Sequence, residues 1–133
     1  MMSALLLAVI VLGPVGQRPG CSRAAAIAAE EGVDHLRTWS DLHAAFKQFA
    51  ACDDGATGEG WSDFVVRTLA RKWSTLGELE RLTKNDKAFR AFVIRHIDDT
   101  TDPDDRRRLL TNARDRCPAS SRTLCADLVE AAK

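Results

Sequence analysis

The segment WSDFVVRTLARKW, residues 61–73, decides the fold class. Its large apolar residues recur every fourth position, at Trp61, Val65, Leu69 and Trp73. Side chains four residues apart share one face of an α-helix, whereas a half-buried strand alternates apolar and polar residues. The segment is therefore predicted to form an amphipathic helix with this face turned toward a core.

The same spacing continues along the chain, and no strand-like alternation competes with it. Six helices are expected, at about 40–52, 59–74, 76–83, 86–98, 103–116 and 121–132. Their starts are predicted from capping residues: Asp102 followed by Pro103 is the clearest, and Ser40, Asn85 and Ser121 are the others. Gly55 suits a left-handed residue after a helix. The predicted fold class is all-α, a small bundle of about six helices with short connections.

Length and charge narrow the function classes. The chain has 133 residues, of which 45% are hydrophobic and 29% charged, and 19 basic residues balance 19 acidic ones. This is the composition of one globular domain, not of a disordered chain. Zero net charge, with basic residues spread over every helix and no interleaved aromatics, argues against nucleic acid as a partner.

The amino terminus resembles an export signal. Residues 4–12 read ALLLAVIVL and are followed by Gly13 and Pro14. This apolar run is too short to cross a bilayer, which takes about 20 residues, but it fits the apolar core of a secretory signal peptide. Small residues favour cleavage after residue 26 or 28, and an earlier cut near Gly16 or Gly20 stays open. We therefore expect a signal peptide and disordered start over 1–28, a single helical domain over 29–133 without a membrane span, and a periplasmic location.

The cysteines point to disulfide chemistry. Cleavage after residue 26 or 28 would remove Cys21 and leave Cys52, Cys117 and Cys125. A bridge from Cys117 to Cys125 across a helical hairpin is the first expectation. The alternatives are Cys52 paired with Cys117 or Cys125, and no bridge. No spacing among these cysteines and the three histidines fits a zinc site.

The segment CDDGATGEGWSD, residues 52–63, is the most distinctive candidate site. Its acids do not follow the ligand spacing of a calcium-binding EF-hand loop, so no metal is predicted. Glu59 and Asp63 lie four residues apart, which suits the acidic first turn of a helix better than a pair of catalytic carboxylates. The glycines would let a partner approach the backbone closely, with an exposed tryptophan as an anchor. The predicted partner-binding residues are Asp53, Asp54, Glu59 and Trp61.

A second acidic cluster covers residues 98–105, before Arg106, Arg107 and Arg108. Capping and pairs such as Asp104 with Arg108 account for it, and a charged rim read by a partner is the alternative. In a simple up-and-down bundle, three helix lengths would separate it from residues 53–63. The two acidic segments are therefore expected at opposite ends of the bundle.

No catalytic residue is predicted. The sequence contains no recognisable nucleophile and base, metal-binding quartet or phosphate-binding loop, so we expect a protein that is not an enzyme and needs no cofactor. His96 falls on the apolar face of its helix, where a hydrogen-bonded core histidine is expected.

Four motifs resemble those of short, exported, all-helical bacterial proteins that are mostly uncharacterised: CDDG at 52–55, GEGWSD at 58–63, FVIRHID at 92–98 and C-P-x₆-C at 117–125. In size, export and helical class the chain is also similar to periplasmic immunity proteins against secreted amidases. This resemblance implies a protein-binding module, an immunity or inhibitor protein. The alternatives are a structural or stress-related periplasmic protein without a tight partner, and a calcium-binding or cell-wall-acting enzyme.

Overall fold

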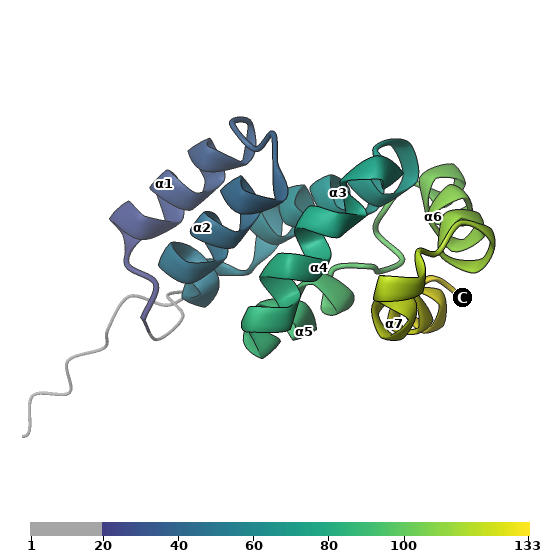
Figure 1. Cartoon of the computed structure of the whole chain (residues 1–133). Coiled ribbons are helices and arrows are strands. Elements are labelled where there is room, and N and C mark those ends of the chain that lie inside the picture. Colours follow the sequence, from purple (N-terminus) through teal and green to yellow (C-terminus); the bar gives the residue numbers. More distant parts are fainter. Residues whose placement is uncertain (1–19) are drawn as a thin grey trace, which may run out of the picture.

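The computed structural model describes residues 20–133, and within them the protein is all α-helical. Of the signal peptide and disordered start expected over 1–28, residues 1–19 lie outside the described residues. Figure 1 shows α1 and α2 side by side at one end of the molecule and α6 and α7 at the other, with α3 between them. The helices are α1 (Arg23–Val33), α2 (Trp39–Phe49), α3 (Gly55–Arg71), α4 (Leu76–Asn85), α5 (Lys87–Arg95), α6 (Pro103–Asp115) and α7 (Arg122–Ala132).

The expected all-α fold is confirmed, with one helix more than predicted. Helix α1 begins at Arg23, inside the range assigned to the leader and disordered start, where Ser22 caps it by accepting from the Ala25 N–H. The other six match the predicted segments, and short 3₁₀ turns complete three of them: η1 (Ala50–Cys52), η2 (Trp73–Thr75) and η3 (Ala119–Ser121). In the described part, no helix is long and apolar enough to cross a membrane.

The structure corrects several predicted helix ends. Thr38, not Ser40, caps α2 in a capping box with Asp41, and Asp86, not Asn85, caps α5. Asp102 and Pro103 start α6 as predicted. Gly55 has the expected positive φ, 51°. Helix α3 begins there, about four residues before the start expected near residue 59.

Helix α3 is central because two other helices pack along it. It contacts α1 near its start and α6 near its end, while α4 packs on α2 and α5. Gly60 allows the close approach to α1, since a Cβ there would lie 2.4 Å from Val33 Cγ1. Gly60 thus allows α1 and α3 to pack closely within the molecule.

Aromatic residues fill the core at the centre of this arrangement. The largest fully buried side chains include Trp39, Trp61, Phe89 and Phe92. The indole N–H of Trp39 donates to Thr75 Oγ1 and that of Trp73 to the Arg116 carbonyl, so neither donor is left without a partner. All three tryptophans serve the core, as their helical spacing predicts.

Two disulfides hold the outer segments, where one was expected. The predicted bridge from Cys117 to Cys125 is present and ties the end of α6 to α7. Cys52 pairs with Cys21, so the alternative of Cys52 with Cys117 or Cys125 is wrong. The sequence predicts removal of Cys21 because small residues favour a cleavage site after residue 26 or 28. A cut after residue 26 or 28 would divide α1 and separate Cys21 from its partner.

Candidate functional site

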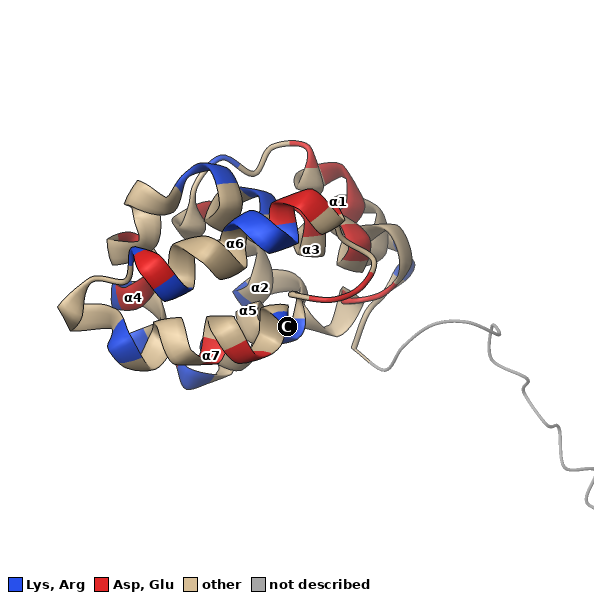
Figure 2. Ribbon diagram, turned by 90° about the vertical axis from the view of Figure 1, so that its right-hand side faces the viewer, with Lys and Arg blue, Asp and Glu red and all other residues tan. Residues whose placement is uncertain are grey.

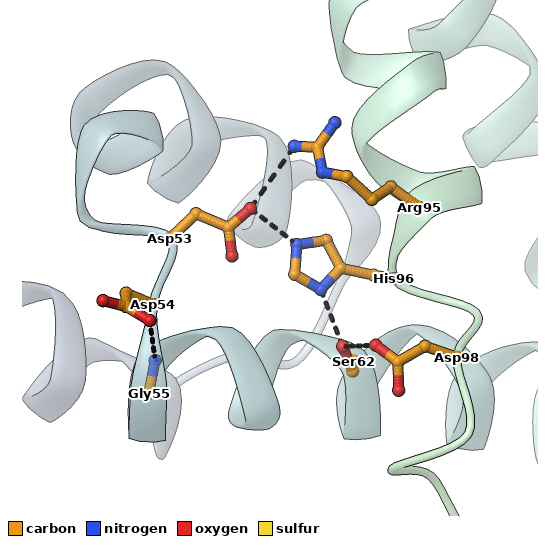
Figure 3. Close-up of polar contacts among 7 residues, drawn as sticks. All are labelled: Asp53, Asp54, Gly55, Ser62, Arg95, His96 and Asp98. Carbon is orange, nitrogen blue, oxygen red and sulfur yellow. Dashed lines mark hydrogen bonds and ion pairs between the residues drawn. The ribbon is translucent and has the colours of Figure 1, made fainter.

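The two acidic segments meet at one place on the surface. Residues 52–54 lead into α3, and residues 96–98 follow the end of α5. Figure 3 shows their side chains turned toward one another, with Asp53 on one side of His96 and Ser62 on the other. The expectation that these segments lie at opposite ends of the bundle is wrong.

Crossing of the helices explains this difference. The prediction assumed helices laid up and down beside one another. In the structure, His96 at the end of α5 contacts Ser62, which lies two turns inside α3. Helix α5 therefore ends over the first half of α3 instead of continuing to its far end. Helical periodicity carries no information about such a crossing.

His96 is the centre of the cluster. Its side chain is 6% exposed, and its Nδ1 lies 2.7 Å from Ser62 Oγ while its Nε2 lies 3.0 Å from Asp53 Oδ2. Phe92 and Trp61 pack on the ring, with centroid distances of 4.4 and 6.1 Å. His96 is thus the hydrogen-bonded core histidine that its position on the helix predicts.

Counting protons assigns the donors in this network. Ser62 has one O–H, which donates to Asp98 Oδ2 at 2.9 Å. Its oxygen is then free to accept from the Nδ1–H of His96. The other ring nitrogen, Nε2, faces the Asp53 carboxylate. Ser62 and His96 thus connect the carboxylates of Asp53 and Asp98 in one series of hydrogen bonds.

Arg95 adds a positive charge to the cluster beside the Asp53 carboxylate. Its guanidinium lies 3.3 Å from Asp53 Oδ2 and stacks over Phe92 at 5.7 Å from the ring centroid. The cluster therefore places the Arg95 guanidinium and the carboxylates of Asp53 and Asp98 around the His96 ring. Their hydrogen bonds hold the charged groups in fixed positions, which lowers the entropy that a binding partner would have to remove.

Asp98 is stabilised as a carboxylate. Burial alone would raise its pKa, but hydrogen bonds from the Thr100 side chain and amide and from Ser62, together with the charge of His96, lower the pKa below its ordinary value. The group thus stays ionised across neutral pH. It accepts and does not donate hydrogen bonds there.

The cluster borders a shallow hollow. Its volume is about 430 Å³, and it is lined by Ala50, Asp53, Arg95, His96 and Asp98. The contacts run from a serine (Ser62) through a histidine (His96) to an aspartate (Asp53), as in the catalytic triad of serine hydrolases. However, Ser62 is 2% exposed and its hydroxyl proton points to Asp98. A nucleophile must face the substrate and pass its proton to the base, and this hydroxyl does neither.

The residues predicted to bind a partner have separate roles. Asp53 lies in the cluster, and Asp54 caps α3 by accepting from the Gly55 N–H at 2.9 Å. Glu59 is exposed on α3. Trp61 is 1% exposed, so it packs in the core and offers no surface anchor. Only Asp53 of the four lines the hollow.

The remaining acids act within the fold. Asp63, which was weighed as a partner of Glu59, pairs with Arg67 at 3.2 Å. Asp105 is buried and pairs with Arg71 at 2.9 Å. Asp104 pairs with Arg107 and not with Arg108 as expected. Figure 2 shows acidic and basic segments side by side on α4 and α6, so neither helix presents charge of a single sign.

Sequence reasoning missed Ser62 and Arg95 as members of the site. The available signal was Ser62 itself, a polar residue beside Trp61 on a helix that buries most of its surface. A buried hydroxyl needs a partner, but the sequence does not say that the partners are 34 and 36 residues away.

Comparisons with known proteins leave the site to be interpreted from its geometry. No family model matches the chain, and no curated protein or solved structure shows significant similarity to it. Among residues 20–133, no group of histidine, cysteine and acidic side chains is placed to hold a metal ion.

Proposed function

We propose that the protein is an exported protein-binding module and that the hollow beside His96 is part of the surface that meets its partner. The observation that carries this proposal is the convergence of Asp53, Arg95 and Asp98 on one face, held in place by hydrogen bonds to one another and to the buried residues His96 and Ser62. Fixed charges of both signs favour a partner with complementary charges, because they set the register and the association rate at an interface.

Export is the second part of the proposal. Disulfides persist in oxidising compartments, and all four cysteines of the chain are bridged. The apolar run at residues 4–12 agrees with secretion through a cleaved leader. Cleavage near Gly16 or Gly20 would keep Cys21, which forms a bridge to Cys52. We therefore place the cut before residue 21 and the mature protein in the periplasm.

An immunity or inhibitor role is the form of binding that suits these features best. Such a protein needs a stable fold outside the cytoplasm and a rigid recognition face. Two disulfides would supply the first, and the hydrogen-bonded cluster would supply the second. A structural or stress-related protein without a tight partner is the alternative that the same experiment tests.

Capture of the partner from native envelopes, compared between two matched arginine variants, tests the proposal. Ala50 lines the hollow, whereas Ala44 is exposed on α2 outside it. We expect Ala50→Arg to block the hollow and lose a stoichiometric partner that the wild type and Ala44→Arg retain. Arg95→Glu should act like Ala50→Arg, since it reverses an exposed charge.

Thermal unfolding of each variant is the control for a damaged fold. Ala44→Arg and Ala50→Arg are at exposed positions, so their thermal midpoints should stay near that of the wild type. Arg95→Glu also removes the ion pair with Asp53, so its thermal midpoint should fall somewhat and its capture is measured well below that midpoint. If Ala50→Arg and Arg95→Glu capture the same partner as the wild type, the hollow is not the interface. If the wild type captures no stoichiometric partner, the structural alternative replaces the proposal.

A further inference from the structure

A second hollow lies between the connection from α1 to α2 and the second half of α3. Its volume is about 290 Å³. Three buried residues form its less polar part, Leu36, Phe64 and Thr68, with 8%, 4% and 6% exposure. Four exposed cationic residues complete the lining, Arg37, Arg67, Arg71 and Lys72. No acidic residue lines it.

Helical geometry gathers these residues. Arg67, Thr68, Arg71 and Lys72 lie three, four, seven and eight positions after Phe64, so these residues share one face of α3 and its carboxyl end. Leu36 and Arg37 approach this face from the α1–α2 connection. The cations are thus concentrated by the fold in a chain whose formal net charge is zero.

Carboxylates within the fold pair with only two of these cations. Arg67 pairs with Asp63 and Arg71 with Asp105. The guanidinium of Arg37 instead donates to the carbonyls of Asp34 and Leu36, at 2.8 and 2.9 Å. These bonds orient the group, and its charge also helps to lower the pKa of the nearby Asp41 carboxylate. Lys72 forms no ion pair with any residue of the described chain. Positive charge therefore remains at the rim.

We propose that this hollow, termed the cationic pocket, binds a carboxylate carried on a small apolar group. Guanidinium and ammonium groups at the rim would hold the carboxylate by charge-assisted hydrogen bonds. Leu36 and Phe64 would contact the apolar group. An inorganic anion has no such group and would make no apolar contact with these two side chains. The volume lies near the lower end of the range for ligand sites, about 300–1,000 Å³, and so suits a small group.

Titration calorimetry on the full chain compares two probes that differ only in charge. N-acetyl-phenylalanine carries the carboxylate, and N-acetyl-phenylalanine amide keeps the same apolar group without it. We expect at least about tenfold tighter binding of the acid, because a carboxylate accepts hydrogen bonds from cationic groups more strongly than an amide does. Binding of the acid should weaken as salt is added. Equal binding of both probes, or none at millimolar concentration, overturns the proposal.

The carboxylate could belong to the carboxyl terminus of a peptide chain or to a small organic acid, and a peptide probe distinguishes these two sources. A tripeptide ending in phenylalanine with a free carboxyl terminus is compared with the single acetylated residue. Tighter binding of the peptide assigns the cationic pocket to chain ends, and equal binding assigns it to small organic acids. Both outcomes support the cationic pocket. If inorganic phosphate bound as tightly as the acid, the proposed contact of the apolar group with Leu36 and Phe64 would be wrong.

Matched variants locate the binding. Lys72→Gln and Arg37→Gln each remove one cation from the rim and should weaken binding of the acid about tenfold. Lys84→Gln removes an exposed cation from α4, outside the lining, and should leave the affinity unchanged. Lys72 is exposed, so its substitution tests the rim without disturbing the core. Equal affinities for Lys72→Gln and Lys84→Gln would show that the anion binds elsewhere.

Discussion

At the scale of single residues, Ser62 connects the two acidic segments. Its hydroxyl contacts Asp98 in a partly buried hydrogen bond and His96 in a buried one. Ser62→Ala should lower the free energy of unfolding by about 1–3 kcal/mol, because it leaves two polar groups without their partner. Urea unfolding measures this. Ser120→Ala, at an exposed position, is the control, and equal stability of the two variants would contradict the role of Ser62.

The lowered pKa values of three aspartates predict how the free energy of unfolding depends on pH. The amides of Arg37 and Thr38 lower the pKa of Asp41, the His43 side chain and the Phe89 amide lower that of Asp86, and the contacts described above lower that of Asp98. Because the folded pKa values lie below the ordinary 3.8, the unfolded chain takes up protons first on acidification. The stabilisation is complete above that value and is lost as the pH falls through the folded pKa values.

Asp41→Asn isolates one part of this effect. At neutral pH the variant should unfold more easily than the wild type, since an amide accepts the hydrogen bonds from the Arg37 and Thr38 N–H groups more weakly. The difference should shrink as the pH falls below about 4. Urea unfolding at a series of pH values measures it, and a difference that stays constant down to about pH 2 would refute the assignment.

At the scale of elements, the contact between α1 and α3 depends on Gly60. A methyl group there would meet the Val33 side chain, so Gly60→Ala should cost about 1–3 kcal/mol by overpacking. Val33→Ala in the same chain should restore part of the loss. Gly77→Ala is the matched control in α4, where nothing lies within 4 Å of the new Cβ, and it should leave stability equal or raised. Thermal unfolding of the wild type, the two single variants at positions 33 and 60 and the double variant gives the coupling.

The elements also show what the sequence could predict. Apolar spacing located α3 and five further helices because each buries a stripe of its own residues, such as Trp61, Val65 and Leu69. It missed α1, whose mostly small residues follow closely on a leader-like run and bury only Ala29. The candidate site could not be predicted from the sequence for a different reason. Asp53 and His96 are 43 residues apart, and their contact depends on how α5 crosses α3.

At the scale of the whole molecule, the two disulfides stabilise unequal loops. Cysteine separations of 31 and 8 residues correspond to about 3.7 and 2.5 kcal/mol in the chain-entropy description. Replacing Cys21 and Cys52 by alanine should therefore lower the free energy of unfolding more than replacing Cys117 and Cys125. Guanidinium unfolding of both double variants measures the order. The reverse order would show that the loop around Cys21 is held mainly by other contacts.

The order of pairing has a consequence for how the protein matures. Each bridge joins cysteines that are consecutive along the chain, the first with the second and the third with the fourth. A chain threaded across a membrane amino terminus first would thus meet the correct partner before any later cysteine arrives. An oxidase acting on the emerging chain would form the native bonds directly, without reshuffling by an isomerase. The yield of oxidised protein should fall in cells that lack the oxidase and persist in cells that lack only the isomerase.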